Sequence, residues 1–254
     1  MIMVKGTAKE AGPMHEVLEQ DRLYVTVDML ILAVRDGRLN LLLSRRTSPP
    51  YAGRWALPGR FIGTEESAET AVRRLLEEML PVEDAYLEQL YTFTDVNRDP
   101  RGRVISTAYL VILSQRKLDR ILQERETSFL RFAVTDQDGL RLKGEDGTGL
   151  IGSDLAFDHG RIIETGLQRL RGKIDYTDVG FRFLNDPQSF SLGELQTVFE
   201  AVLAKKLDAS NFRRFIRNKY EETGKITATD REEKSGRGRP AAIYQLDIKG
   251  GREP

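Results

Sequence analysis

Two apolar, β-branched runs separated by a tight turn form the first patterned stretch of the chain. The first run extends from Tyr24 to Val34 and the second from Leu39 to Ser44, with Asp36 and Gly37 between them. An Asp-Gly pair between two such runs is a strong signal for a β-hairpin. We therefore predict a hairpin here. Residues 1–20 before it are polar and without pattern, and we expect an N-terminal arm that is loose or holds a short helix.

The next patterned stretch repeats with a helical period. Its apolar residues recur three or four positions apart and would form one broad stripe on a helix. Ser67 is expected to cap this helix and Pro81 to end it, because serine accepts hydrogen bonds from a first turn and proline cannot continue a helix. The stripe comprises Ala68, Ala71, Val72, Leu75, Leu76 and Met79.

Further β patterns follow this helix. We predict strands over Tyr86 to Thr94 and over Val104 to Leu113, and two short strands between Phe129 and Leu142. A loop rich in Gly and Asp between Gly144 and Gly152 precedes a helix from Asp154 to about Arg171. Strands and helices in this order indicate an α/β fold around one sheet.

A second structural unit is predicted beyond residues 185–187, where the composition changes around a proline. Its first helix would extend from Ser191 to about Lys206, and a short turn would lead to a second, basic helix from Asn211 to Tyr220. Two strands, Lys225 to Thr229 and Ala241 to Leu246, would then flank a basic tip. Two helices joined by a turn and followed by a hairpin predict a winged helix-turn-helix.

Basic residues gather on the second helix and at the hairpin tip. Between Lys205 and Lys219 the chain has six basic residues and one acidic residue, Asp208. Arginine can hydrogen-bond guanine edges in the major groove, and a wing arginine can reach the minor groove. A solvated helix face would also be basic, but the turn spacing and the tip favour binding to double-stranded DNA. The DNA-contacting residues that we expect are Lys206, Ser210, Asn211, Arg213, Arg214, Arg217, Lys219, Arg237 and Arg239.

The composition excludes several classes of site. The 254 residues have a formal net charge of zero, so a surface for nucleic acid has to be local. The absence of cysteine excludes disulfides and thiolate chemistry, and the two histidines, His15 and His159, lie in unrelated contexts. No apolar run approaches a membrane span and the N-terminus has no signal-peptide pattern, so we expect a cytoplasmic protein without a membrane segment.

The stretch 57–81 contains the motif with the clearest chemistry. Glu66 and Arg74 stand at the spacing of a Nudix box, and the stretch resembles that box without a gap. In that family the box forms a loop and a helix, and the helix glutamates hold Mg²⁺ against a nucleoside diphosphate linked to another group. Here the first glycine of the pattern is Arg60 and its closing glycine is Pro81.

Two of the metal-binding glutamates of that pattern are replaced by Leu75 and Met79, which are four residues apart and would share a helix face. Mg²⁺ requires oxygen ligands, which neither side chain offers. A register shifted by one residue would keep Glu77 and Glu78, but the flanking sequence and the apolar stripe favour the ungapped register. We therefore expect no catalytic residue, no bound metal and no cofactor.

Over nearly its whole length the chain resembles the Nudix-related transcriptional regulators of the NrtR type. The matching stretches are 88–93, 98–103, 155–159 and 207–214, while the segment Leu140 to Gly152 is extra. The resemblance implies a Nudix α/β/α sandwich followed by a winged helix-turn-helix domain. It also implies a cytoplasmic homodimer on a DNA operator, which a metabolite bound to the Nudix domain releases or alters. ADP-ribose is the effector in the branch linked to NAD metabolism, and a related branch senses arabinose.

The resemblance also suggests where the domains begin and end. We expect the N-terminal arm over 1–20, a Nudix-like sensing domain over 21–155, a connecting helix and linker over 156–186, and the winged helix-turn-helix domain over 187–254.

Without a metal, a phosphorylated effector would need positive charge from the protein. Arginine pairs with phosphate through two hydrogen bonds, and Arg60 could occupy the space of a lost metal–phosphate contact. Trp55 and Phe61 could stack on a base, although core packing is the role that we favour for both. The effector-contacting residues that we expect are Arg45, Arg46, Arg54, Trp55, Arg60, Phe61, Glu66 and Arg98.

Three functions remain open from the sequence. The favoured one is a ligand-responsive transcriptional regulator, expected to be a repressor, whose catalytically inactive Nudix domain senses ADP-ribose or a sugar derivative. The alternative is an active Mg²⁺-dependent pyrophosphohydrolase for ADP-ribose or a related nucleoside diphosphate, based on Glu66, Glu77 and Glu78. A protein-interaction adaptor, with the basic helix contacting an acidic partner, is the third.

Overall fold

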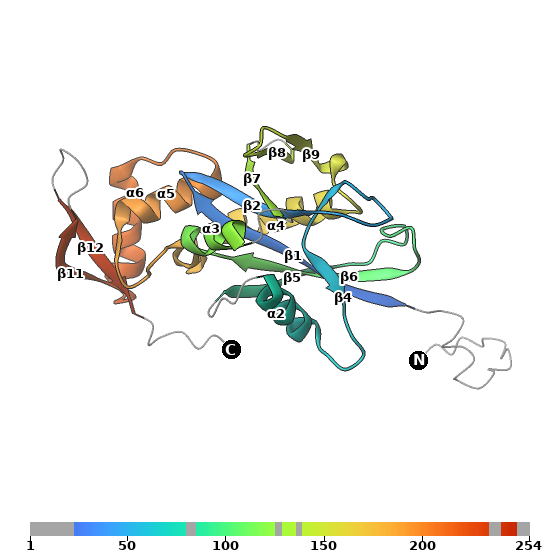
Figure 1. Cartoon of the computed structure of the whole chain (residues 1–254). Helices are drawn as coiled ribbons and strands as arrows, with labels where there is room; N and C mark the ends of the chain where they lie inside the picture. Colours follow the sequence, from blue (N-terminus) through green and yellow to red (C-terminus); the bar gives the residue numbers. More distant parts are fainter. Residues whose placement is uncertain (1–22, 80–84, 125–128, 136–138, 234–239, 248–254) are drawn as a thin grey trace, which may run out of the picture.

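The computed structural model describes residues 23–79, 85–124, 129–135, 139–233 and 240–247. A large mixed sheet with helices on both faces forms most of the molecule, and a smaller unit of helices and a hairpin lies beyond one end of the sheet (Figure 1). The first elements are β1 (Tyr24–Arg35), β2 (Arg38–Arg45), β3 (Trp55–Ala56), β4 (Gly59–Phe61), α2 (Ala68–Met79), β5 (Tyr86–Phe93) and β6 (Val104–Ile112). They are followed by α3 (Gln115–Glu124), β7 (Phe129–Val134), β8 (Arg141–Gly144), β9 (Gly149–Ile151), η1 (Gly152–Asp154) and α4 (His159–Lys173).

Strand β1 lies in the middle of the sheet and is buried on both faces. The strand order is β5-β6-β1-β2-β7-β8-β9, with β3 paired to β2 and β4 paired to β1. Successive side chains of a strand point to opposite faces, so Met29 joins one apolar core and Leu30 joins the other. This burial on two sides explains the continuous apolar run of the sequence. The pairing of β1 with β2 around Asp36 and Gly37 confirms the predicted hairpin.

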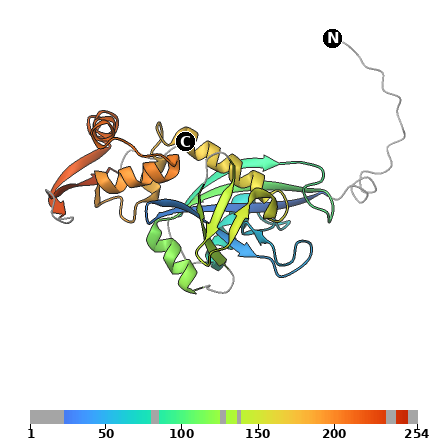
Figure 2. The same cartoon turned by 90° about the horizontal axis from the view of Figure 1, so that it is seen from above.

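Helices cover the two faces of this sheet (Figure 2). On the Met29 face, α2 and α3 pack through residues such as Val72 and Leu118. On the Leu30 face, α4 packs closely, and a Cβ at Gly166 would stand 2.2 Å from a Leu30 methyl group. These layers form the predicted α/β sandwich. No helix in the described part of the chain is long and apolar enough to cross a membrane.

Helix α2 has the cap and the apolar stripe expected of it. The amide of Thr70 donates to the Ser67 hydroxyl at 3.1 Å, just before the helix begins. The side chains that this helix buries against the sheet are Ala71, Val72, Leu76 and Met79. The predicted cap and apolar stripe are therefore confirmed, and the predicted end of the helix at Pro81 lies outside the described residues.

The C-terminal unit is a winged helix. It contains η2 (Val179–Phe183), β10 (Phe190–Ser191), α5 (Leu192–Leu203), α6 (Ala209–Ile216), η3 (Arg217–Glu221), β11 (Ile226–Glu233) and β12 (Ala241–Leu246). The predicted capping box of Ser191 and Glu194 is present at the start of α5. Phe199, Phe212 and Tyr220 are buried here, in the same continuous core that contains Leu30-face residues of the sheet. The predicted helices, turn and hairpin are confirmed.

Two predicted helix boundaries are wrong, both because a residue takes a left-handed conformation. The helix expected from Asp154 begins at His159, since η1 precedes it and Phe157 has φ 54°. The helix expected to reach Lys206 ends before Ala204, which has φ 50°. An apolar pattern does not reveal such single residues.

Helix α3 and strand β9 have no counterpart among the predicted elements. Helix α3 packs Leu118, Ile121 and Leu122 against the sheet at helical spacing, a short pattern that the sequence-based prediction overlooked. Strand β9 has only three residues, Gly149–Ile151, and a strand of that length gives no detectable period.

Candidate functional site

A pocket of about 230 Å³ opens between β1, β4, the loop before β6 and the start of α4. It lies where segments distant in the sequence meet, because β1 runs parallel to β6 and α4 packs on the same sheet. We call it the arginine pocket. The cationic and aromatic side chains that line it are Arg46, Arg60, Arg98, Arg101, Phe61 and Phe157.

Arg98 forms the buried floor of the arginine pocket. Its side chain is 3% exposed and donates to both oxygens of Asp158, with its Nε at 3.0 Å and its Nη2 at 2.7 Å. The Nη2 atom also lies 3.4 Å from Asp28 on β1. Burial alone would lower the pKa of Arg98, but the hydrogen bonds and charges of the two carboxylates outweigh it and raise the pKa. The positive charge of Arg98 is therefore fixed and internally paired.

His159 supports the same floor as a neutral imidazole. The amide of Leu57 donates to its Nδ1 at 2.8 Å, and its Nε2 lies 3.6 Å from Asp28. Burial lowers the pKa of His159, which keeps the ring uncharged near pH 7. Gly59 completes the packing, since a Cβ there would stand 2.2 Å from the Asp28 carboxylate.

Two arginines surround the mouth of the pocket. The Arg46 guanidinium lies 4.7 Å from the Phe157 ring centroid. Arg101 lies 5.4 Å from that ring and 5.1 Å from the Phe61 ring, and is held by Asp99 at 2.6 Å. Burial, followed by the nearby charge of Arg101, lowers the pKa of Arg46. An anion bound between the two guanidinium groups would reduce this repulsion and add hydrogen bonds.

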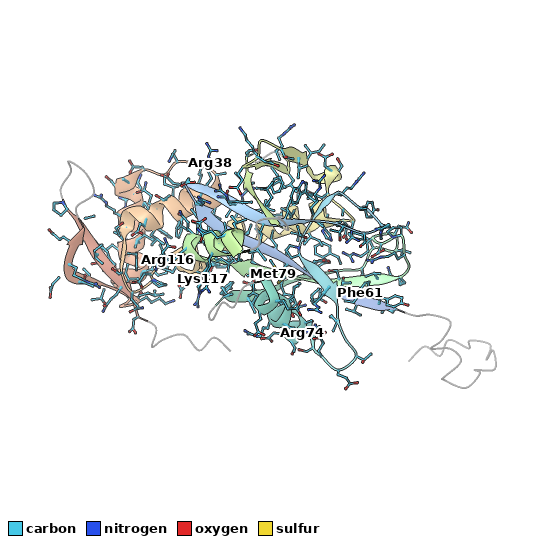
Figure 3. The ribbon with its side chains drawn as sticks, viewed as in Figure 1. Arg38, Phe61, Arg74, Met79, Arg116 and Lys117 are labelled. Atoms are coloured by element: carbon cyan, nitrogen blue, oxygen red, sulfur yellow. The ribbon has the colours of Figure 1, made fainter. Side chains whose placement is uncertain are left out.

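Two carboxylates of the box, Glu66 and Glu78, are bound to arginines. Arg74 donates to Glu66 at 2.5 and 3.0 Å, and Arg60 donates to Glu78 at 2.7 Å. The hydrogen bond from Arg74 lowers the pKa of Glu66, and the one from Arg60 lowers the pKa of Glu78. Figure 3 shows Arg74 and Met79 on α2. The described residues contain no group of three acidic or histidine side chains able to hold a metal ion.

The structure places half of the predicted effector residues in the arginine pocket and half outside it. Those that line it are Arg46, Arg60, Phe61 and Arg98. Glu66 lies outside because it pairs with Arg74, as described above. Arg45 donates to the Gly53 carbonyl at 3.1 Å, and Arg54 reaches the Ser153 carbonyl at 3.4 Å.

Trp55 also lies outside the pocket and packs edge-on against Phe132, with 5.2 Å between the ring centroids. Its role in the structure is core packing. The sequence reasoning missed Arg101, Phe157 and Asp28. Arg101 could have been predicted, because it lies in the same loop as Arg98, which was predicted to contact the effector.

Helix α6 and the residues next to it present most of the predicted DNA-binding residues to solvent. Those that are exposed are Lys206, Ser210, Asn211, Arg213, Arg214 and Arg217. Arg214 donates to the Asn211 side chain at 2.9 Å. Lys219 differs, because its Nζ bonds the Asp175 carbonyl and lies 4.9 Å from the Tyr220 ring. Arg237 and Arg239 lie outside the described residues.

Comparison with known proteins assigns both parts of the chain. The family description of the NUDIX domain matches residues 23–146, and that of the NrtR DNA-binding winged helix domain matches residues 180–246. The chain is 32% identical to the ADPR responsive transcriptional repressor NtrR of Acinetobacter baylyi, over 89% of this chain and 82% of the relative. It is 28% identical to the ADP-ribose pyrophosphatase of Methanocaldococcus jannaschii, over 58% of this chain and 77% of the relative.

A solved structure shows the same two-part arrangement. The crystal structure of Shewanella oneidensis NrtR complexed with a 27mer DNA matches with a TM-score of 0.68 and 30% identity, over 87% of this chain and 93% of that chain.

Proposed function

The chain belongs to the NrtR family of Nudix-related transcriptional regulators, and from this premise we propose that it is a repressor that binds ADP-ribose without hydrolysing it. The observation that carries the proposal is a pocket lined by four arginines next to a box in which Glu66 and Glu78 are already paired with arginines. The A. baylyi relative is named as ADPR responsive, which favours this effector.

The arginine pocket suits a diphosphate. Arg46 and Arg101 lie 4.7 and 5.4 Å from the centroid of the same Phe157 ring, and guanidinium groups bind phosphate oxygens through paired hydrogen bonds. Arg60 also lines the pocket, and its contact with Glu78 is a partly exposed ion pair that a phosphate can replace. These groups supply the charge that Mg²⁺ supplies in a catalytic Nudix site.

The absence of hydrolysis follows from the box helix. Metal-assisted attack on a phosphate needs an ion that bridges and polarises its oxygens. Met79 is buried in the core, and Glu66 and Glu78 are held by arginines. The competing function, a Mg²⁺-dependent pyrophosphohydrolase, is favoured by the name of the M. jannaschii relative and by Glu77 and Glu78 in the shifted register.

The winged helix supplies the DNA contacts in this proposal. The solved relative is a complex with DNA, and here α6 exposes Arg213 and Arg214, and the start of η3 exposes Arg217. We propose a homodimer, because two copies of α6 would read half-sites about one helical turn apart. ADP-ribose would favour the dimer conformation that does not fit the operator.

Arg46→Ala is expected to weaken ADP-ribose binding at least about tenfold, because a charge-assisted hydrogen bond contributes about 1.5–3 kcal/mol. The measurement is the rise in melting temperature with ADP-ribose in the presence of EDTA, since a ligand that binds only the folded state stabilises it. Arg45→Ala is the matched control: it removes the neighbouring arginine, which lies outside the pocket, and should bind like wild type. If ADP-ribose does not stabilise the wild-type protein, the proposed effector is wrong.

A further inference from the structure

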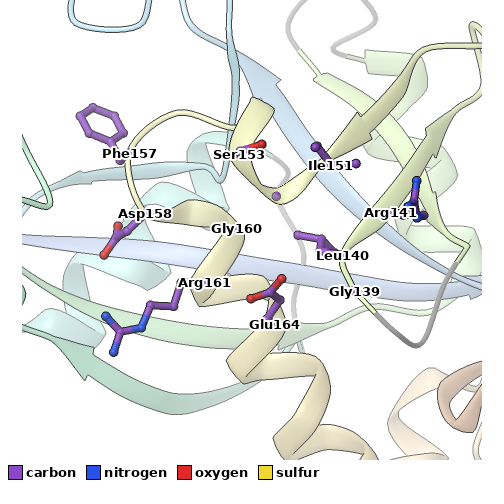
Figure 4. Close-up of a pocket in the computed structure, with 11 residues that line it drawn as sticks. Gly139, Leu140, Arg141, Ile151, Ser153, Phe157, Asp158, Gly160, Arg161 and Glu164 are labelled. Atoms are coloured by element: carbon purple, nitrogen blue, oxygen red, sulfur yellow. The ribbon is translucent and has the colours of Figure 1, made fainter.

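A second cavity, of about 520 Å³, lies between the β8–β9 hairpin and the first turns of α4 (Figure 4). It borders the arginine pocket, because Phe157 lines both. Many of its lining residues, from Ile151 to Glu164, lie between the stretches that match the NUDIX and winged-helix families. We call it the hairpin cavity.

The floor of the hairpin cavity is closely packed backbone. A Cβ at Gly160 would stand 2.6 Å from the Gly152 carbonyl oxygen, so η1 lies directly on the first turn of α4. The Ile151 amide donates to Asp154 at 2.8 Å, and the Ala156 amide donates to the Trp55 carbonyl at 2.9 Å. These contacts fix the lining of the cavity in the absence of a ligand.

Glu164 gives the hairpin cavity its polar character. It is exposed on α4, and among the described residues it has no hydrogen bond or ion pair. The neighbouring charged groups are occupied, since Arg161 pairs with Asp95 and Asp158 pairs with Arg98. A carboxylate accepts hydrogen bonds and repels phosphate, so it favours a ligand group with hydroxyl donors.

The opposite side of the cavity carries the aliphatic side chains of Leu140 and Ile151 and the guanidinium group of Arg141. Ile151 is 45% exposed, and Figure 4 shows it across the cavity from Glu164, with Leu140 between the hairpin and the helix. A pentose combines the two matching surfaces, because its vicinal hydroxyls donate hydrogen bonds while its C–H groups pack against an aliphatic side chain. Acidic side chains hold ribose hydroxyls in this way in dinucleotide-binding folds.

We propose that the hairpin cavity binds a pentose of the effector, with Glu164 accepting hydrogen bonds from two neighbouring hydroxyls and Ile151 packing against the ring. The phosphates of the same molecule then lie in the adjoining arginine pocket. This inference rests on the proposed function, because it requires a phosphorylated sugar in that pocket. It makes the protein selective for the sugar as well as for the phosphates.

The test compares two ligands, ADP-ribose and inorganic pyrophosphate, by isothermal titration calorimetry in EDTA. Pyrophosphate has the diphosphate group of the effector but no pentose. Glu164→Ala is expected to lower the affinity for ADP-ribose about tenfold, which is the effect of losing hydrogen bonds to a charged group. The affinity for pyrophosphate should not fall. Ile151→Ala should lower the affinity for ADP-ribose by a smaller factor. Both side chains are exposed, so the melting temperatures without ligand should stay those of wild type.

Gln168→Ala is the matched control, since Gln168 is exposed one turn further along α4 and does not line the cavity. ADP-ribose affinity of Glu164→Ala equal to that of wild type would overturn the assignment of the cavity. An equal loss of pyrophosphate affinity in Glu164→Ala would overturn it as well, because the effect would not depend on the pentose. Failure of the wild-type protein to bind either ligand is a different result and contradicts the proposed function itself.

Discussion

Replacing Arg98 with methionine is expected to lower the free energy of unfolding by about 3–5 kcal/mol, the effect of removing one member of a buried charge cluster. The Arg98 side chain is 3% exposed, and the side chains of Asp28 and Asp158 are 8% and 14% exposed. Methionine fills a similar volume but leaves two carboxylates without a counter-ion in a medium that solvates charge poorly. The floor of the arginine pocket would be lost together with this stability.

Urea unfolding of the ligand-free protein measures this effect. Arg116→Met is the matched control, because Arg116 is exposed on α3, and its free energy of unfolding should stay within about 0.5 kcal/mol of wild type. In the double variant Arg98→Met with Asp158→Asn, part of the loss should be restored, since one unpaired charge is removed. A loss below about 1 kcal/mol for Arg98→Met alone would show that the two carboxylates do not need this guanidinium.

Arg214→Ala is expected to weaken operator binding by about 1–3 kcal/mol, or five- to a hundredfold, the contribution of one arginine that reads a base edge. Arg214 is exposed on α6, and the described residues show it bonded only to Asn211, which the same surface presents. Lys219→Ala should have a much smaller effect on DNA affinity, because its amine is directed to the Asp175 carbonyl.

Fluorescence anisotropy with an operator selected from a random duplex pool checks this prediction. Arg73→Ala on α2 removes an exposed arginine from the sensing domain and should bind the operator like wild type. The variants should also keep the melting temperature of wild type, since the substituted side chains are exposed. If Arg214→Ala bound the operator with the same affinity as wild type, the assignment of α6 to the DNA interface would be wrong.

Elements with a strong period were predictable from the sequence, and their packing explains why. Strand β1 is buried on both faces, so its residues form an unbroken apolar run, and α2 buries one stripe, so its residues repeat with a helical period. Helix α3 also has apolar residues at helical spacing, Leu118, Ile121 and Leu122, so it was predictable from the sequence but was overlooked. Phe157 and Ala204 end or delay helices through their backbone conformation, which side-chain hydrophobicity does not report.

The candidate site was only partly predictable because it depends on long-range packing. Arg98 and Asp28 are 70 residues apart, and they meet because β1 pairs with β6 and the loop before β6 folds back over it. Arg60 was expected to take the place of a metal contact, and the structure pairs it with Glu78 instead of leaving it free. Its role toward a phosphate therefore stays a prediction.

Release of the operator by ADP-ribose in EDTA tests the central claim most directly. The protein–operator complex is titrated with ADP-ribose, and the nucleotide is then analysed by chromatography, with and without Mg²⁺. The account predicts that the operator is released at saturating ADP-ribose and that the nucleotide is recovered intact in both buffers. An operator complex that is unchanged by ADP-ribose, or Mg²⁺-dependent cleavage of ADP-ribose to AMP and ribose 5-phosphate, would contradict it.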